Sequence, residues 1–255
     1  MLLVIDIGNT NIVLGAFQGP LLEHSWRVAT RRDRTADEYA VLCRNLFQTA
    51  SLGAADIEAI MISSVVPPLN EYFEELSRKY FGLKPEFVEP ENQDLIPIRY
   101  RPASDVGADR IVTAIAALEM LGAPAIVVDF GTATTFDAIS DKGEYLGGII
   151  APGIGISAEA LFMRASRLPR IEIRKPPRII GDSTVTSMQS GIYYGYVALV
   201  EGILKRMKGE LGDAAVIATG GFASTIAKET SSIGSVEEDL MLYGLRIFYE
   251  KRHLA

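Results

Sequence analysis

Short apolar runs separated by polar turns open the chain. Apolar residues occupy positions 2–5, and the polar segment 6–10 separates them from a second apolar run at 11–17. A Gly-Pro turn then precedes a third run, at 21–29, in which apolar and polar residues alternate. Runs of this length, bounded by Gly, Pro, Asn and Asp, predict three consecutive β-strands.

Helical and extended patterns alternate after these strands. Thr35 and Glu38 form a capping-box pattern, and apolar residues at helical spacing follow it, which predicts a helix. The next patterns predict a strand at 57–65, a helix at 68–81 and a short strand at 85–88.

A long segment without periodicity follows. Residues 89–107 are rich in proline and polar side chains, which is typical of a loop beside a functional cleft. Helical spacing resumes at 108–121 and is followed by Gly122. A further helix is predicted from about 188 to 208.

The opening pattern recurs almost half a chain length later. An apolar run at 125–128, a polar turn at 129–134, a strand and a further run at 145–150 follow one another as at the start of the chain. The run at 215–218 then takes the place that 57–65 has in the first half. The identical pairs in this alignment are Val4 with Val127, Asp6 with Asp129 and Gly8 with Gly131. We therefore predict two related α/β lobes, residues 1–120 and 121–255.

Composition narrows the class of partner. The 255 residues are 48% hydrophobic and 22% charged, and acidic residues outnumber basic ones by 32 to 25, which gives a net charge of −7. This excess of negative charge disfavours non-specific binding to nucleic acid and to anionic membranes, so a small-molecule partner is expected. Cys43 has no partner for an intramolecular disulfide, and two histidines do not suggest a zinc site. Neither a signal peptide nor a membrane span is indicated, so a soluble cytoplasmic protein is expected.

The polar turns after the two leading strands carry the candidate chemistry. In each of the segments 6–11 and 129–134, a carboxylate ends an apolar strand, and a glycine and small donor side chains follow. Such a turn can present N–H and hydroxyl groups to a phosphate while the carboxylate holds a hydrated cation. One copy alone is better explained by a simple hairpin turn with a favoured Asp and Gly. Two copies at equivalent positions favour a polyphosphate site.

Two such turns facing each other across a cleft resemble the actin, Hsp70 and sugar-kinase superfamily. That superfamily has an α/β fold of two ribonuclease-H-like lobes with a nucleotide cleft between them. There, a Gly-Gly turn after a late strand lies against the adenosine, and the segment 218–222 is similar to it.

Six motifs resemble one family within this superfamily, the type III pantothenate kinases. They are Asp6-Ile7-Gly8-Asn9-Thr10, Ser63-Ser64-Val65-Val66-Pro67, Gly107-Ala108-Asp109-Arg110, Asp129-Phe130-Gly131-Thr132-Ala133-Thr134, Gly147-Gly148-Ile149-Ile150-Ala151-Pro152-Gly153 and the segment from Thr184 to Gly191. They occur in the family's order and extend over almost the whole chain. The resemblance implies a transferase that uses ATP to phosphorylate the primary hydroxyl of pantothenate, the first step of coenzyme A biosynthesis. It also implies a homodimer.

The resemblance assigns roles to individual residues. The ATP-binding residues implied are Asp6, Ile7, Gly8, Asn9, Thr10, Asn11, Ile12, Val13 and Thr132. The pantothenate-binding residues implied are Tyr100, Gly107, Ala108, Asp109, Arg110 and Thr184, with Asp109 as the general base and Thr184 delivered across the dimer interface. Asp6 is implied to serve the Mg²⁺ on the ATP phosphates, and Asp129 to hold a monovalent cation, K⁺ or NH₄⁺.

Simpler interpretations exist for the substrate residues. Asp109 lies in the first helical turn, where unpaired N–H groups stabilise its charged form, so the position alone predicts a weak base. A weak base is sufficient for phosphoryl transfer, because the transition state is loose and orienting the hydroxyl matters more than removing its proton early. Arg110 suits a carboxylate ligand, although a surface arginine would look the same. Without the resemblance, Tyr100 is a loop aromatic and Thr184 an N-cap.

Other patterns point elsewhere. Residues 153–158 match the dinucleotide pattern G-x-G-x-x-A, although Pro152 precedes it. Arg31, Arg32 and Arg34 form a basic cluster without an evident role, and the basic run from 164 to 178 is best explained as a solvated loop. No Gly-x-x-x-x-Gly-Lys-Ser/Thr string supplies a phosphate-binding lysine. A catalytically silent nucleotide-sensing regulator on the same fold is the alternative function, which the three aspartates Asp6, Asp109 and Asp129 argue against.

Overall fold

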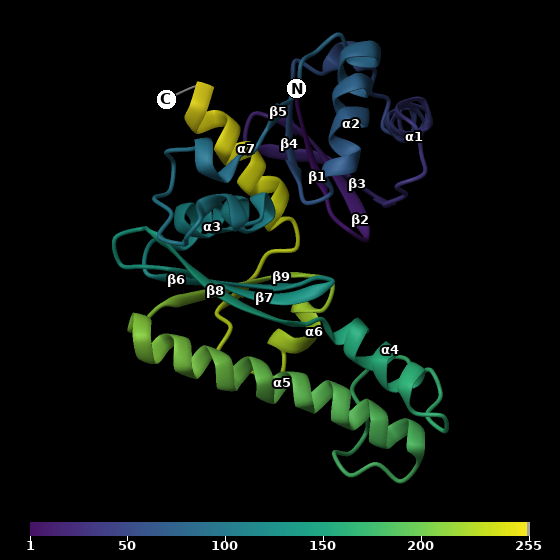
Figure 1. Ribbon diagram of the computed structural model, residues 1–255, viewed down its shortest axis with the longest axis vertical. Helices are drawn as coiled ribbons and strands as arrows, with labels where there is room; N and C mark the ends of the chain where they lie inside the picture. The colour runs from purple at the N-terminus through teal and green to yellow at the C-terminus, as the bar shows by residue number, and fades with distance from the viewer. Residues whose placement is uncertain (254–255) are drawn as a thin grey trace. The chain divides into compact units, whose positions relative to one another are not determined.

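The structure, a computed structural model, describes residues 1–253 and divides the chain into two compact units (Figure 1). The first unit contains Met1–Ala116 and the C-terminal segment that begins at Asp239, and the second contains Ala117–Glu238. This division differs from the predicted lobes 1–120 and 121–255, because the last helix packs on the strands of the first unit. None of the helices in residues 1–253 is long and apolar enough to cross a bilayer.

The first unit contains a five-stranded mixed sheet of order β3-β2-β1-β4-β5. Its strands are β1 (Leu2–Ile7), β2 (Asn11–Gln18), β3 (Leu21–Ala29), β4 (Ala59–Ser64) and β5 (Glu86–Phe87). The first three strands pair antiparallel, whereas β4 and β5 continue the sheet in parallel from β1. The predicted strands are confirmed, and β5 is shorter than expected.

Helices cover the first sheet. Those of the first unit are α1 (Ala36–Thr49), α2 (Asn70–Leu76) and α7 (Leu240–His253), while α3 (Ala108–Leu121) begins there and ends in the second unit. Short 3-10 turns occupy Ala54–Asp56, Pro67–Leu69, Pro90–Asn92 and Ala103–Asp105, and a π-helical turn occupies Ser77–Phe81. The predicted helix 68–81 is therefore a 3-10 turn, α2 and the π turn in succession. The capping box before α1 is confirmed, because the Thr35 N–H donates to Glu38 Oε2 over 2.8 Å.

Successive side chains of β1 point alternately into the core of the first unit and to the opposite face of the sheet. Leu3, Ile5 and Ile7 are fully buried in the apolar cluster that includes residues of α1 and α2. Since successive side chains of a strand point to opposite faces, Val4 and Asp6 belong to the other face. Leu242 of α7 packs there, near Gly15 of β2 and Val4. The sheet therefore presents Asp6 on the face that α7 covers.

The second unit repeats the strand order of the first. Its sheet runs β8-β7-β6-β9-β10, so β6 takes the place of β1 and β9 that of β4. The strands are β6 (Ala125–Phe130), β7 (Ala133–Ile139), β8 (Tyr145–Pro152), β9 (Ala215–Gly220) and β10 (Ser235–Val236), and the helices are α4 (Ile154–Arg164), α5 (Thr184–Leu211) and α6 (Ala223–Ala227). The internal repeat predicted from the sequence is confirmed at the level of topology.

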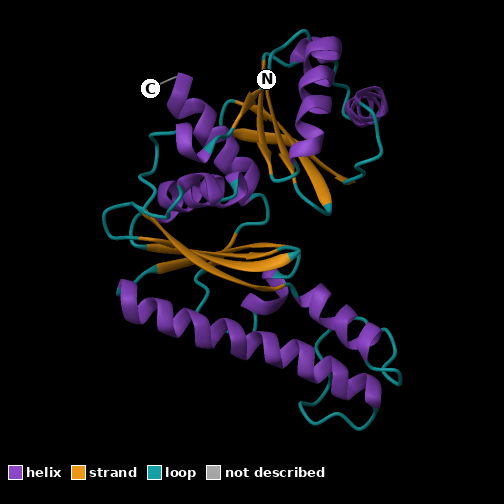
Figure 2. Cartoon of the chain, in the orientation of Figure 1, coloured by secondary structure: helices purple, strands orange, loops and turns teal. Residues whose placement is uncertain are grey.

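The long helix α5 lies along one face of the second sheet (Figure 2). Tyr196, Val200 and Leu204 of this helix pack into one apolar cluster with Val128 and Phe136 of the sheet. The helix begins at residue 184 rather than near 188, because Ser183 caps it with a side-chain hydrogen bond. This capping signal consists of small polar residues and is easily overlooked in the sequence.

Candidate active site

An acidic turn ends the central strand of the first unit. Asp6, next to the end of β1, is in register with Ser63 on β4 and Val13 on β2. The backbone N–H of Gly8 donates to Asn11 O over 3.0 Å and closes the turn into β2. Asp6 is partly buried, while Asn9 and Thr10 are exposed at the tip. The turn thus combines a partly buried carboxylate with small donor groups that are exposed to solvent, the residue types that the sequence predicts.

Residues of the loop after β3 form hydrogen bonds to this turn. Thr30 donates its hydroxyl to Gly8 O over 2.6 Å and its backbone N–H to Thr10 O over 3.0 Å. The guanidinium of Arg32 donates to Asn9 Oδ1 over 3.1 Å. The sequence analysis does not place Thr30 or Arg32 at this site, because residues far apart in sequence give no local signal that they lie close together in space.

The start of α3 lies beside the ends of β1 and β4. Val65, just after β4, donates its backbone N–H to Ile7 O over 3.1 Å. A Cβ atom built on Gly107 would lie 3.6 Å from Cγ1 of the same valine. Val65 therefore connects the acidic turn with the segment that begins α3, and Asp109 lies in the first turn of that helix.

The Asp109 carboxylate folds back over Gly107. Its Oδ1 accepts a hydrogen bond from the backbone N–H of Arg110 over 2.8 Å. A Cβ atom at Gly107 would collide with this oxygen, so only glycine leaves the carboxylate this position. The Gly107-Ala108-Asp109-Arg110 motif thus holds one carboxylate in a defined place at a helix N-terminus.

Burial raises the pKa of Asp109 above its usual value of 3.8, although the backbone N–H and the guanidinium of Arg110 favour the charged form. The expectation that the helix start makes Asp109 a weaker base is therefore wrong. Loss of solvent around the carboxylate outweighs the stabilisation by the helix terminus. A carboxylate with a raised pKa is a better proton acceptor.

The other predicted substrate residues differ in accessibility. Ala108 is buried, and Arg110 is partly buried beside Asp109. Tyr100 is 39% exposed in the loop that precedes the 3-10 turn Ala103–Asp105. An aromatic side chain at this level of exposure can contact a ligand that approaches this loop from solvent.

The second unit carries the corresponding acidic turn. Asp129, next to the end of β6, is in register with Thr219 on β9. Gly220, at the end of β9, has a φ of +90°, and a Cβ atom there would lie 2.6 Å from Asp129 Oδ1 and 2.7 Å from Phe130 O. At the end of β8, a Cβ atom at Gly153 would lie 2.8 Å from Gly131 O and would collide with Thr132 O. Two glycines therefore leave room for a group of oxygen atoms around the turn that contains Thr132.

These oxygen atoms fit cations. Carboxylate and carbonyl oxygens are ligands for hard cations, and Mg²⁺ in kinases is commonly held by one or two carboxylates together with substrate phosphates. Within residues 1–253, no group of three or more His, Cys, Asp or Glu side chains is arranged to hold a metal ion. This donor set fits an ion that arrives with a phosphate chain better than a metal held by protein side chains alone.

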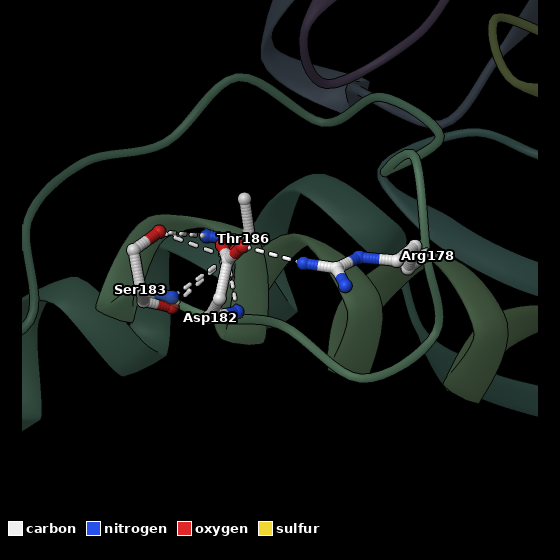
Figure 3. A network of polar contacts seen from close by, with 4 residues as sticks. All are labelled: Arg178, Asp182, Ser183 and Thr186. Carbon is white, nitrogen blue, oxygen red and sulfur yellow. Dashed lines mark hydrogen bonds and ion pairs between the residues drawn. The ribbon is translucent and has the colours of Figure 1, made fainter.

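Thr184 is the first residue of α5. Next to it in the sequence, Arg178, Asp182, Ser183 and Thr186 form a network of polar contacts (Figure 3). Ser183 accepts a hydrogen bond from the Thr186 backbone N–H over 3.2 Å, so the cap is Ser183 and not Thr184. Arg178 forms a 2.6 Å ion pair with Asp182. Twelve residues further along α5, the hydroxyl of Tyr196 donates to Pro152 O, beside Gly153. At 1.5 Å per residue, Thr184 lies about 18 Å along the helix from that contact, so the second unit does not bring Thr184 to its own acidic turn.

The dinucleotide pattern at 153–158 lies in the wrong topology. The strand before it, β8, pairs antiparallel with β7 at the edge of the sheet. A dinucleotide-binding fingerprint requires a parallel βαβ unit. These residues are therefore not the fingerprint of a dinucleotide-binding Rossmann fold. Gly153 of this segment instead leaves room for the carbonyl oxygens of Gly131 and Thr132.

A repeated mixed sheet with an acidic turn after each leading strand defines an α/β protein of the actin, Hsp70 and sugar-kinase superfamily. In agreement, the chain is similar to a solved inorganic polyphosphate/ATP-glucomannokinase from Arthrobacter sp. strain KM, with a TM-score of 0.53, 16% identity and 99% coverage of both chains. It is also similar to a conserved Campylobacter jejuni protein described as a Baf family transcriptional activator, with a TM-score of 0.61, 19% identity and coverage of 99% of this chain and 100% of that chain. At these identities the likeness shows the fold alone.

The family follows from closer relatives. The family model of type III pantothenate kinases matches residues 2–206. The type III pantothenate kinase of Geobacter sulfurreducens is 57% identical over 252 residues, which cover 98% of this chain and 99% of that protein. The chain belongs to the type III pantothenate kinase family.

Proposed function

We propose that this kinase transfers the terminal phosphoryl group of ATP to the primary hydroxyl of pantothenate. The product is 4'-phosphopantothenate, and the reaction is the first step of coenzyme A biosynthesis. The observation that carries the proposal is the position of Asp109, a carboxylate of raised pKa at the start of α3, beside the ends of β1 and β4. Family membership supplies the identity of the substrate.

Asp109 acts on the hydroxyl that is phosphorylated. Its carboxylate accepts a hydrogen bond from this hydroxyl, orients the oxygen toward the phosphorus and takes the proton as the new bond forms. The Arg110 guanidinium pairs with the pantothenate carboxylate, for which its planar donors are suited. In this proposal, Tyr100, Gly107 and Ala108 form the rest of the pantothenate site.

The acidic turn of the first unit binds the phosphate chain of ATP. The proposed ATP-binding residues of this segment are Asp6, Ile7, Gly8, Asn9, Thr10, Asn11, Ile12 and Val13. Thr132 is proposed as a further residue that contacts the nucleotide phosphates. Asp6 holds the divalent ion that accompanies ATP. A bound Mg²⁺ stabilises the charge that develops on the phosphate oxygens.

Asp129 is the proposed ligand of a monovalent cation, K⁺ or NH₄⁺. Asp129 Oδ1 and Phe130 O both lie close against Gly220, where a Cβ atom would meet them at 2.6 and 2.7 Å, and this pair of oxygen atoms supports the assignment. A cation there offsets phosphate charge that a phosphate-loop lysine neutralises in other enzymes.

A homodimer completes the proposed site, with Thr184 contributed to the partner subunit. Apolar side chains gather on and near α4 and the start of α5, as expected for a surface that another subunit covers. The exposed apolar residues of this region include Ile150, Ile156, Leu161, Phe162, Met163, Ile179, Ile180 and Val185. The cytoplasmic location stays a prediction.

One coupled assay tests the function. Purified protein is mixed with ATP and Mg²⁺, with or without pantothenate, in a series of Na⁺, K⁺ and NH₄⁺ salts, and ADP release is recorded. We expect ADP release only with pantothenate, and activation by K⁺ or NH₄⁺ over Na⁺. Nucleotide binding without turnover would instead support the regulator, and phosphate release independent of pantothenate would support a plain ATPase.

A further inference from the structure

The loop between β3 and α1 is fixed on the acidic turn of the first unit. Thr30 forms two hydrogen bonds to this turn, and Tyr39 of α1 forms hydrogen bonds to the next residue of the loop, Arg31. The Tyr39 side chain is 1% exposed, and its hydroxyl accepts from the Arg31 N–H over 2.9 Å and donates to Arg31 O over 2.8 Å. The backbone that carries the three arginines is therefore held in one place relative to the turn.

The three arginines of this loop have different surroundings. Arg34 lies over the Tyr39 ring, with its guanidinium carbon 5.8 Å from the ring centroid. Arg31 is held through its backbone. Arg32 instead extends its guanidinium to Asn9 at the exposed tip of the turn, with 3.1 Å between Nη2 and Oδ1. Of the three, Arg32 is thus the one whose side chain contacts the turn proposed to hold the ATP phosphates.

We propose that Arg32 binds the phosphate chain of the nucleotide. A guanidinium has five donors, so the bond to Asn9 leaves others for phosphate oxygens. The turn itself carries the negative charge of Asp6, which opposes a triphosphate unless cations compensate it. Because the chain has no phosphate-loop lysine, Arg32 supplies a positive charge on this side of the turn. The inference rests on the proposed function, since it deepens the assignment of the ATP site.

Nucleotide binding to Arg32 variants tests the proposal without the need for turnover. ATP affinity is measured by calorimetry with Mg²⁺ and no pantothenate, and adenosine binding by saturation-transfer NMR. For Arg32→Ala we expect a rise of about tenfold or more in the Kd for ATP, as for the loss of charge-assisted hydrogen bonds. The Kd for adenosine stays within about twofold. Arg32→Lys keeps the charge without the planar donors, so an intermediate Kd is expected.

Arg44→Ala is the matched control, because Arg44 is an exposed arginine on α1 and its loss changes the net charge equally. An ATP Kd in Arg32→Ala within twofold of this control would overturn the proposal. So would an equal loss of ATP and adenosine binding, which would indicate a general disturbance of the site. If the wild-type protein binds ATP but does not phosphorylate pantothenate, the proposed function fails while the role of Arg32 is still decided by these Kd values.

Discussion

Two of the proposed site carboxylates, those of Asp109 and Asp129, each lie against a glycine. A side chain at Gly107 would collide with the carboxylate of Asp109, and one at Gly220 would approach that of Asp129. The two glycines are visible in the sequence, but their purpose is not, because it depends on a neighbour's side chain in one case and on a different strand in the other. At both positions, the missing Cβ leaves room for oxygen atoms that can bind a proton or a cation.

Asp109→Asn separates catalysis from stability. We expect kcat to fall about 10²- to 10⁴-fold, the usual range for loss of a positioned acid–base group. Because burial raises the pKa of Asp109 from 3.8, the folded state binds this proton more tightly than the unfolded state, and the carboxylate destabilises the fold above that pKa. The variant should therefore have a higher free energy of unfolding at pH 7.

Urea unfolding across a pH series measures this second effect. The stability gained by Asp109→Asn should shrink as the pH falls through the pKa of Asp109 and vanish below the unfolded value of 3.8. Near-normal kcat would remove Asp109 from the mechanism. A variant less stable than the wild type at pH 7 would contradict the raised pKa.

Gly220→Ala tests the crowded end of β9. The residue has a φ of +90°, which side chains disfavour, and its Cβ would lie 2.6 Å from Asp129 Oδ1. Backbone strain and overpacking together should lower the free energy of unfolding by about 2–4 kcal/mol. Gly221→Ala is the matched control, because a Cβ atom there meets nothing within 4 Å. Chemical denaturation of both variants measures the difference, and equal stabilities would show that Asp129 is not packed against Gly220.

At the scale of elements, local signals predict the structure where the residues that decide it are adjacent in sequence. The capping box of Thr35 and Glu38 starts α1, and short apolar runs become the central strands. Local sequence signals do not predict those parts of the structure that depend on tertiary contacts. No periodicity shows that the segment 77–81 forms a π turn, or that α7 packs on the strands of the first unit.

Besides the strands of the first unit, α7 also contacts α3. A Cβ atom at Gly244 of α7 would collide with Val112 O and lie 2.7 Å from Val112 Cγ1. Glycine therefore lets the two helices approach closely. We expect Gly244→Ala to lower the free energy of unfolding by about 2–4 kcal/mol, because the contacted backbone atom cannot easily move.

Gly209→Ala on α5 is the control for this substitution. It also replaces a helical glycine, but its Cβ atom meets nothing within 4 Å. Since alanine is the better helix former, this variant should gain about 0.5–1 kcal/mol. Thermal or urea unfolding of the pair gives the comparison. A stable Gly244→Ala protein would contradict the close packing of α7 on α3.

For the whole molecule, the repeat predicts the architecture and the resemblance supplies the chemistry. The equal strand orders of the two sheets follow from a pattern that three identities and similar runs already indicate. The candidate site is less predictable. The pKa of Asp109 depends on burial, and the position of Arg32 depends on hydrogen bonds between the acidic turn and the loop after β3. The role proposed for Thr184 depends on a second subunit. No local pattern in the sequence contains this information.

Mixing two inactive variants tests the role of Thr184 in the assembled enzyme. If Thr184 serves the active site of the partner subunit, Asp109→Asn and Thr184→Ala homodimers are both impaired, because each site lacks one group. A heterodimer contains one site with both groups intact and one with neither. Random exchange of subunits should therefore restore about a quarter of the wild-type activity per subunit, since half of the dimers are mixed and each has one working site.

The exchange is made by mild denaturation and refolding of the two tagged variants together, and pantothenate-dependent ADP release is measured before and after. Each variant refolded alone is the control. Activity that stays at the sum of the two parents, although tandem affinity purification shows that mixed dimers form, would place Thr184 in the site of its own chain or outside the site. The 18 Å or so along α5 between Thr184 and the Tyr196–Pro152 contact favours restored activity, because the helix does not return its first residue to the turn of Asp129 in the same chain.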